Sequence, residues 1–381
     1  MWLSGLRQRF TKPSYRKVPW VRILPLPPNL YMKILLHLSD NNKFIDEYLM
    51  FNQIAFERVD FYDNAINYYN LSSLSKLSAD LLIVDTKQFF SMLEWETSRR
   101  HLIEFLCGDG YVWAWNDMDG MVDVRNDFDI LKKFDSEIPA GRMTCITDGK
   151  FSNNNEHKLN NIQIEMLPYS NFMRVPRIFN SSVAKKNCKK DFLATVEIRP
   201  NRPHRLVLQK EVLSRPVLAE AGYNCFRKEG DPWFGIQPTQ HAWRSGYPSM
   251  DLYTDVWVEL VSETVYKDVW FITEKIIKPI ATKTPFLVQS TPGYLEYLKS
   301  YGFKTFSSLI DESYDSEFDL HKRTSMIVDQ LERIVNAGAD KFFEASEDIL
   351  EHNQRRLFEL SGCWEYQTDI FMKNMLLKIS T

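Results

Sequence analysis

The sequence lacks the features that identify membrane, secreted and metal-stabilised proteins. No apolar run approaches the roughly 20 residues that cross a bilayer, and the apolar stretch at the N-terminus is too short for a signal peptide. None of the seven histidines forms a His-x-x-x-His pair. The five cysteines contain no Cys-x-x-Cys pair, which argues against a disulfide framework and a zinc site: Cys107, Cys145, Cys188, Cys225 and Cys363. We therefore expect a cytoplasmic protein from a reducing compartment, without a bound metal.

An excess of charge of one sign is also missing. Lys and Arg number 47 and Asp and Glu 50, for a net charge of −3, which does not favour a dedicated nucleic-acid binder. Residues 1–22 are the exception, because they contain no acid and six basic residues: Arg7, Arg9, Lys12, Arg16, Lys17 and Arg22. We interpret this segment as a basic arm that is either solvated or in contact with phosphates or an anionic surface.

Strand-like and helical patterns alternate along the 381 residues, which exceed one ordinary hydrophobic core. Strands are predicted within residues 31–40, 79–86, 110–120, 143–150, 192–198, 255–263 and 285–290. Helices are predicted within residues 42–56, 88–106 and 293–302, from about 203, and in several pieces from 320 onward. This alternation predicts an α/β protein with mostly parallel, Rossmann-like sheets, whose ligands bind beyond the carboxyl ends of the strands.

A polar stretch near the middle of the chain predicts a domain boundary. Residues 151–163 resemble a loop, and the strand-then-helix pattern restarts at about 188. After the arm we therefore expect an N-terminal α/β domain at 23–175, a second at 176–320 and C-terminal helices at 321–381. Two such domains facing each other across a cleft are the expected architecture.

The segment DVWFITEKIIKP, residues 268–279, predicts an anion site in the second domain. Thr273 is a good N-cap, and Glu274 suits the positive first turn of a helix. Lys275 lies on the unfavourable side of the helix dipole, a conflict that a bound anion would remove. Pro279 keeps this helix short.

Three arginines at 199–205 support the same prediction. Arg199, Arg202 and Arg205 follow a predicted strand and lie where the next helix begins. A solvated loop would explain them taken alone. Together with Lys275 in the same predicted domain, they favour an anion-binding site.

The segment VELVSETVYKDVWFITEK, followed by TPFLV, resembles the donor-binding motif of the α1,3-fucosyltransferase family. That motif reads Phe-Glu-Asn-Ser, then Tyr-x-Thr-Glu-Lys, then Val-Pro-Val. Glu263 and Thr264 match its first part, with Thr264 in place of Asn, and Thr273, Glu274 and Lys275 match the second.

The resemblance implies a GT-B glycosyltransferase whose second domain binds a nucleotide sugar. Glu274 would bind the donor ribose. Lys275 would bind the diphosphate together with an upstream arginine, either Arg205 or Arg202.

A segment of the first domain, WAWNDMD at 113–119, is similar to the segment Trp-Val-Trp-Met-Asn-Phe-Glu that holds the catalytic base in that family. Asp119 would be the base, although its side chain is one methylene shorter than glutamate, and Asp117 is the alternative. Both could instead belong to a solvated acidic turn. They also form an Asp-x-Asp pattern, as 127–129 do, which would bind a divalent ion in the other large glycosyltransferase fold.

We therefore expect an inverting, metal-independent glycosyltransferase with a nucleotide sugar as co-substrate and no other cofactor. Its acceptor would be a hydroxyl of a glycan, a lipid or a protein, or a hydroxymethylated base in DNA. Residues 302–315 resemble soluble glycosyltransferases of phages and large viruses, which implies viral DNA modification in the host cytoplasm. The alternatives are a metal-dependent Asp-x-Asp glycosyltransferase and a non-catalytic nucleotide-sugar-binding protein.

Overall fold

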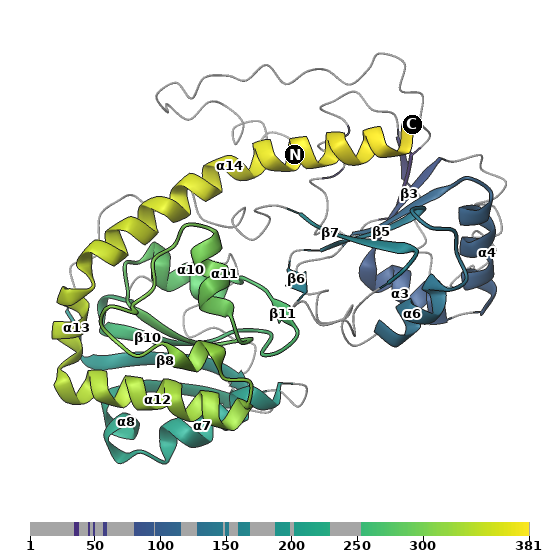
Figure 1. The fold of residues 1–381 in the computed structure, drawn as a ribbon. Helices are drawn as coiled ribbons and strands as arrows, with labels where there is room; N and C mark the ends of the chain where they lie inside the picture. Colours follow the sequence, from purple (N-terminus) through teal and green to yellow (C-terminus); the bar gives the residue numbers. More distant parts are fainter. Residues whose placement is uncertain are drawn as a thin grey trace, which may run out of the picture.

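The residues that the structure describes form two larger parallel β-sheets, each covered by helices (Figure 1), and one two-stranded sheet. The computed structural model describes residues 34–37, 45, 49, 56–58, 80–94, 96–115, 128–147, 149–151, 159–167, 187–198, 202–228 and 253–380. Within these ranges no helix is both long enough and apolar enough to cross a membrane. The basic arm at 1–22 and the predicted boundary at 175/176 lie outside the described residues.

The first sheet has the strand order β2-β1-β3-β4-β5-β7, and every neighbouring pair is parallel. Its strands are β1 (Ile34–His37), β2 (Phe56–Arg58), β3 (Leu81–Asp85), β4 (Tyr111–Trp115), β5 (Met143–Thr147) and β7 (Ile162–Met166). All residues of β3 and β5 are buried, as expected for parallel strands with both faces covered. One face packs on α3 (Thr86–Glu94), α4 (Glu96–Cys107) and α6 (Phe128–Asp135). The other face packs on the C-terminal part of α14 (Glu347–Ser380).

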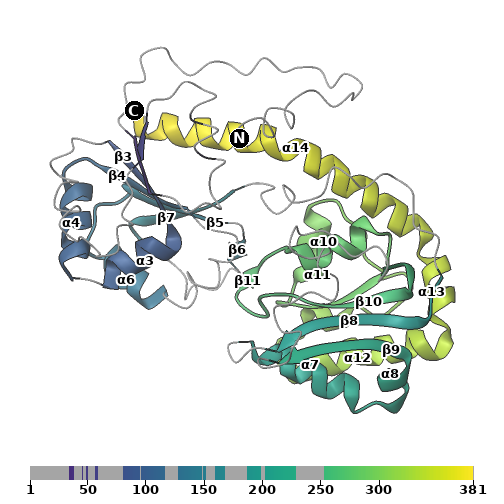
Figure 2. The same cartoon turned by 180° about the vertical axis from the view of Figure 1, so that it is seen from behind.

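The second sheet has the order β12-β10-β8-β9, also entirely parallel. Its strands are β8 (Lys190–Ile198), β9 (Gly222–Lys228), β10 (Val256–Ser262) and β12 (Phe286–Gln289). Figures 1 and 2 show α10 (Glu274–Ala281) and α11 (Tyr294–Ser300) on one side of this sheet. On the other side lie α7 (Pro203–Leu213), α8 (Pro216–Ala221) and α12 (Leu320–Ala337), followed by α13 (Ala339–Ala345).

Each sheet contains a point where the direction of strand addition reverses. In the second sheet the chain runs from β8 to β9 on one side, and then returns to place β10 and β12 on the other. The reversal therefore lies between β8 and β10, and α7 and α10 leave it on opposite faces. In the first sheet the same reversal lies between β1 and β3. Open parallel sheets bind ligands at the carboxyl ends of the strands beside such a reversal.

Helix α14 packs against both halves of the structure. Its N-terminal part contacts α10 beside the second sheet, where Gln354 Nε2 donates to the carbonyl oxygen of Ala281 at 2.7 Å. In its C-terminal part, Leu376 belongs to an apolar cluster with Ile34 and Trp115. A single helix thus joins the two cores.

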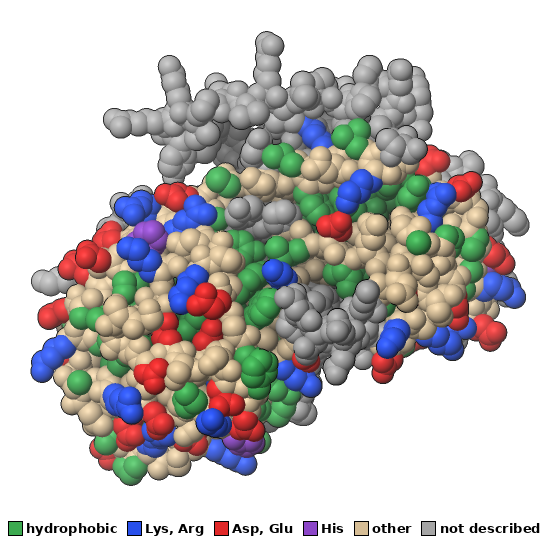
Figure 3. All heavy atoms as spheres, viewed as in Figure 1, with side chains coloured by type: hydrophobic (Ala, Val, Ile, Leu, Met, Phe, Trp, Pro, Cys, Tyr) green, Lys and Arg blue, Asp and Glu red, His purple; other side chains and the backbone are tan. Residues whose placement is uncertain are grey.

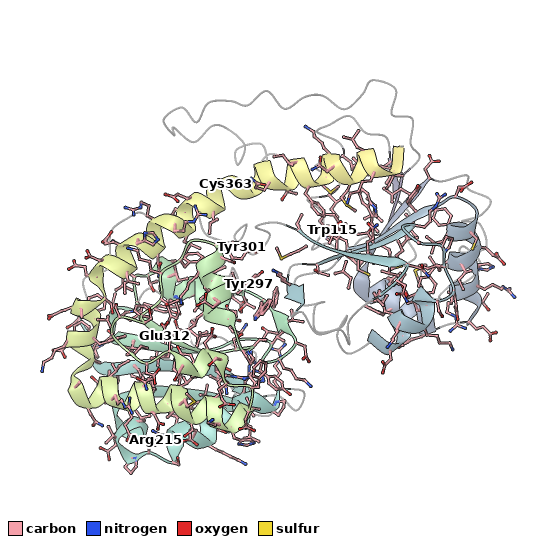
Figure 4. All side chains as sticks on the ribbon, in the orientation of Figure 1. Trp115, Arg215, Tyr297, Tyr301, Glu312 and Cys363 are labelled. Atoms are coloured by element: carbon pink, nitrogen blue, oxygen red, sulfur yellow. The ribbon has the colours of Figure 1, made fainter. Side chains whose placement is uncertain are left out.

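Two further contacts join the carboxyl end of the first sheet to the second half of the chain. The short strand β6 (Lys150–Phe151) follows β5 and pairs antiparallel with β11 (Val269–Trp270), which precedes α10. The hydroxyl of Tyr297, on α11, donates to Sδ of Met166 at 3.5 Å, where β7 ends. Figure 4 shows Tyr297 and Tyr301 on the side of the second sheet that is nearest to the first.

Most of the predicted elements are confirmed, including the strand at 192–198 and the short helix that follows Thr273. Three differ. Residues 88–106 form parts of two helices, α3 and α4, instead of one. Strands β7 and β9 were not predicted, because each is rich in polar residues and owes its place to pairing with a buried neighbour. The final helix is continuous over 34 residues, since its second half packs on the first sheet.

Candidate functional site

The predicted donor-binding residues of the second half gather at the carboxyl end of its sheet, beside the reversal between β8 and β10. Arg202 and Arg205 lie where α7 begins, after β8. Glu263 and Thr264 directly follow β10, and residues 273–275 begin α10. These three segments are far apart in the chain, yet side-chain hydrogen bonds join them.

Glu263 is the residue that connects them. Its carboxylate is fully buried and accepts four hydrogen bonds: from the backbone N–H groups of Thr273 at 3.2 Å and Thr264 at 3.3 Å, and from the hydroxyls of Thr273 at 2.5 Å and Tyr294 at 2.8 Å. Its carbonyl oxygen accepts from Arg205 Nη2 at 3.4 Å and lies 3.0 Å from His204 Nε2. Glu263 therefore links the N-terminal turns of α7, α10 and α11.

Burial raises the pKa of Glu263. The positive charge of Lys275 and the hydrogen bonds from Thr273 and Tyr294 lower it again, but burial has the larger effect. A buried carboxylate without such partners would cost several kcal/mol, on the order of the penalty for an uncompensated charge. These hydrogen-bond donors therefore explain how Glu263 can lie in the core.

His204 is a neutral side chain within a group of arginines. Burial, together with the nearby charges of Arg205, Arg202 and Arg323, lowers its pKa to about 3. Because a carbonyl oxygen can only accept, the contact with Glu263 places the proton on Nε2. One face of the ring stacks on Tyr266, with centroids 4.6 Å apart and planes 24° from parallel.

Lys275 lies in the first turn of α10 and is partly exposed. Thr273 caps the helix, because its hydroxyl oxygen accepts from the backbone N–H of Lys275 at 3.2 Å. Lys275 Nζ donates to Glu274 Oε1 at 2.7 Å and to Thr264 Oγ1 at 3.3 Å. Burial alone would raise the pKa of Glu274, but the ion pair with Lys275 and the charge of Lys278 lower it to about 2. In the free protein, Glu274 thus balances the cation at the positive end of the helix.

Sequence reasoning missed two cations of this site, Arg323 and Lys278. Arg323, in the first turn of α12, is 2 % exposed, and its Nη2 donates to the carbonyl oxygen of Tyr266 at 2.8 Å. Lys278, one turn beyond Glu274, is buried, which lowers its pKa to about 8. The sequence around Arg323 and Lys278 is that of an ordinary exposed helix face, so no sequence pattern marks either residue. Both are buried only because segments distant in the chain pack over them.

Gln289, the last residue of β12, connects the carboxyl end of this strand to the starts of α7 and α12. Its Nε2 donates to the carbonyl oxygen of His204 at 3.0 Å and to Thr324 Oγ1 at 2.8 Å. The hydroxyl of Ser262 donates to its Oε1 at 2.9 Å. The end of β12 and the start of α12 therefore belong to the same edge as the starts of α7 and α10.

The predicted catalytic residues Asp117 and Asp119 lie outside the described residues, as does Arg199. Strand β4 ends at Trp115, so residues 116–119 directly follow the carboxyl end of a central strand of the first sheet. Among the described residues, no three His, Cys, Asp or Glu side chains are grouped so that they could hold a metal ion.

On the face drawn in Figure 3, the described side chains form no patch of one charge. Figure 3 shows Lys and Arg side chains interspersed with Asp and Glu over the visible face of the second sheet's helices. In Figure 4, Arg215 lies at the end of this unit far from the first sheet. Its guanidinium binds three carboxylates, those of Glu211, Asp329 and Glu332, so its charge serves to join helices α7 and α12.

Comparisons with known proteins give little help in assigning a function. No family model and no curated protein matches the chain. Among solved structures the chain is similar to one described as the spinosyn rhamnosyltransferase SpnG, with 11 % sequence identity and a TM-score of 0.30. The match covers 87 % of this chain and 100 % of that one. A likeness this low shows neither the family nor the function of the chain.

We expect the substitution Glu263→Gln to change how stability depends on pH. Because the pKa of Glu263 is raised in the folded protein above its ordinary value of 4.5, its protonated form favours folding. This contribution of Glu263 to the free energy of unfolding is complete at pH values below its pKa in the unfolded protein. It is lost as the pH rises through the pKa of Glu263 in the folded protein. The free energy of unfolding of wild type minus that of the variant should therefore fall as the pH rises above about 4.5.

Urea unfolding of both proteins at a series of pH values measures this difference. Glu344→Gln, on the exposed side of α13, is the control and should leave the pH dependence of wild type unchanged. A difference that rises with pH would show that the hydrogen bonds to Glu263 outweigh its burial.

Proposed function

We propose that the protein is an inverting, metal-independent GT-B glycosyltransferase that binds a nucleotide sugar at the carboxyl end of its second sheet. The observation that carries this proposal is the convergence of Arg205, Glu263 and residues 273–275 on one edge, through the hydrogen bonds of Glu263. Ligands of open parallel sheets bind at such edges, and helix N-termini favour phosphate groups. The same residues are those to which the fucosyltransferase resemblance assigns donor binding.

The donor diphosphate would contact Lys275 and the start of α7. An ammonium group has three donors, and on diphosphate binding Lys275 would share them between the phosphate oxygens and its present partners Glu274 and Thr264. Arg205 is 2 % exposed, so it would act on the diphosphate through its charge from within the protein. Arg202 retains exposed surface on the same helix start and is the better candidate for direct contact.

The carboxylate of Glu274 suits the ribose of the donor. With a pKa of about 2 it is ionised at neutral pH, so its oxygens can accept hydrogen bonds from sugar hydroxyls. Its pairing with Lys275 would hold the ribose next to the diphosphate. Both features agree with the role that the resemblance implies for Glu274.

In the reaction, Asp119 would take the proton of an acceptor hydroxyl while the oxygen attacks the anomeric carbon. The bond from that carbon to the diphosphate breaks at the same time, on the opposite face, which inverts the configuration. The charge that grows on the diphosphate is stabilised by Lys275 and the arginines. The β6–β11 pairing and the contact of Tyr297 with Met166 support this arrangement, because they bring the carboxyl ends of the two sheets toward each other.

A phosphate site built from cations favours a metal-independent enzyme over one in which Asp117 and Asp119 bind a divalent ion. For the acceptor we propose a carbohydrate hydroxyl or a hydroxymethylated base in DNA. The basic residues at 1–22 favour DNA as the acceptor. In that case the protein would be a viral enzyme that acts in the cytoplasm of the host cell. It would flip the modified base out of the duplex. A non-catalytic nucleotide-sugar-binding protein would use the same second sheet without turnover.

Substitution of Lys275 tests the diphosphate contact. Lys275→Ala removes a charge-assisted hydrogen bond worth roughly 1.5–3 kcal/mol. Nucleoside diphosphates should therefore bind about 10- to 150-fold more weakly in calorimetric titrations. The partly exposed pair with Glu274 contributes only about 0–1 kcal/mol, so the melting temperature should change little.

Lys299→Ala is the matched control for Lys275→Ala, since Lys299 pairs with Glu296 at 2.6 Å on α11. Its affinity for nucleoside diphosphates should equal that of wild type. If Lys275→Ala also bound them normally, Lys275 would not belong to the site.

Turnover tests the proposed catalytic base and the independence from metal. Hydrolysis of the nucleotide sugar, a slow side reaction expected of such an enzyme, should continue in excess EDTA. Asp119→Asn should lower turnover by about 100-fold or more and leave donor binding nearly unchanged. Asp117→Asn is the control.

Two outcomes would contradict this mechanism. Activity lost in EDTA and restored by Mg²⁺ or Mn²⁺ would favour the metal-dependent alternative. If Asp117→Asn lost its turnover while Asp119→Asn kept it, the catalytic base would be Asp117 and not Asp119.

A further inference from the structure

Two aromatic side chains lie at the rim of the candidate donor site without a role in the proposed mechanism. Phe318 precedes α12 and is 85 % exposed, more than any other large hydrophobic side chain in the described ranges. Tyr266 lies in the loop between β10 and β11 and is partly exposed. An aromatic ring left in water beside a charged, buried cluster is a candidate surface for a flat ligand group.

Arg323 holds the two segments together. Its Nη2 donates to the carbonyl oxygen of Tyr266 at 2.8 Å, and its Nη1 lies 3.4 Å from that of Phe318 and 2.7 Å from that of Glu317. The backbone carbonyl groups of residues 317–318 and of Tyr266 therefore accept hydrogen bonds from the same buried guanidinium, that of Arg323. This contact places residues 317–318 next to the loop that carries Glu263 and Thr264.

The ring of Tyr266 also has a fixed orientation. One of its faces stacks on His204, whose own position is set by the contact between its Nε2 and the carbonyl oxygen of Glu263 at 3.0 Å. A planar ligand group would meet a preorganised ring, which lowers the entropy cost of binding.

We propose that Tyr266 and Phe318 form the part of the site that binds the nucleobase of the donor. This inference rests on the proposed function, because it assumes that the cations at the start of α7 and α10 bind the donor diphosphate. Every nucleobase has a flat π-face, and stacking on an aromatic side chain contributes about 1–3 kcal/mol per base. The base would thus add affinity that a diphosphate alone lacks.

The test compares a ligand that has a base with one that has none. GDP, UDP and inorganic pyrophosphate are titrated against wild type, Tyr266→Ala and Phe318→Ala. Each substitution should weaken the better-binding nucleoside diphosphate by about 5- to 150-fold and leave the affinity for pyrophosphate unchanged. Tyr266→Phe, which keeps the ring, should bind nucleoside diphosphate as wild type does.

The controls separate stacking from general damage to the fold. Leu213→Ala removes another exposed apolar side chain, 47 % exposed at the far end of α7, and should change neither affinity. Phe318 is so exposed that its removal should not affect folding, so it tests the proposal even if Tyr266→Ala is unstable.

Three results would overturn the inference. Unchanged affinities in both alanine variants would mean that the rings do not contact the base. Equal losses for pyrophosphate and nucleoside diphosphate would show that the two residues act on the phosphate site, which would leave the proposed function intact. A wild-type protein that binds neither ligand would contradict the proposed function together with the inference.

Discussion

The buried carboxylate of Glu263 is the group on which the arrangement of the site depends. Glu263 follows β10 directly, and its carboxylate accepts hydrogen bonds from the first turns of α10 and α11, while its backbone carbonyl oxygen contacts His204 and Arg205 in the first turn of α7. A carboxylate in the core is tolerated only where donors surround it. The need to satisfy Glu263 therefore fixes where three helices begin, and with them the cations that those helices carry.

Hydrogen bonds and ion pairs within the protein hold the positive charges at this edge in place. His204 stays neutral, Arg205 and Arg323 donate to backbone carbonyl groups, and Lys275 pairs with Glu274. Arg205 and Arg323 could therefore keep their present hydrogen bonds when a phosphate group binds. Only the partly exposed pair of Lys275 with Glu274 would have to rearrange. A phosphate ligand would meet a site whose side chains are already ordered, which is the condition for tight and specific binding.

Much of this organisation could be predicted from the sequence. Thr273 as a cap, the short helix that contains Pro279 and the arginines after β8 all follow from local rules of helix capping and strand-helix alternation. The hydrogen bonds of Glu263, by contrast, depend on segments that only the fold brings together. Arg323 gives no signal either, because its neighbours in the sequence are those of an exposed amphipathic helix. Strand β9 was missed for the same reason, since its polar residues become a strand only through pairing with β8.

The central claim is that the edge of the second sheet binds a nucleoside diphosphate through cations of the protein. A thermal-shift panel of nucleoside diphosphates and their sugars, measured with and without EDTA, tests it most directly. The account predicts that at least one of these ligands stabilises the protein, by about 2.7 kcal/mol at a hundredfold excess over its Kd, and that EDTA leaves the shift unchanged. No shift with any nucleotide, or a shift that disappears in EDTA, would contradict it.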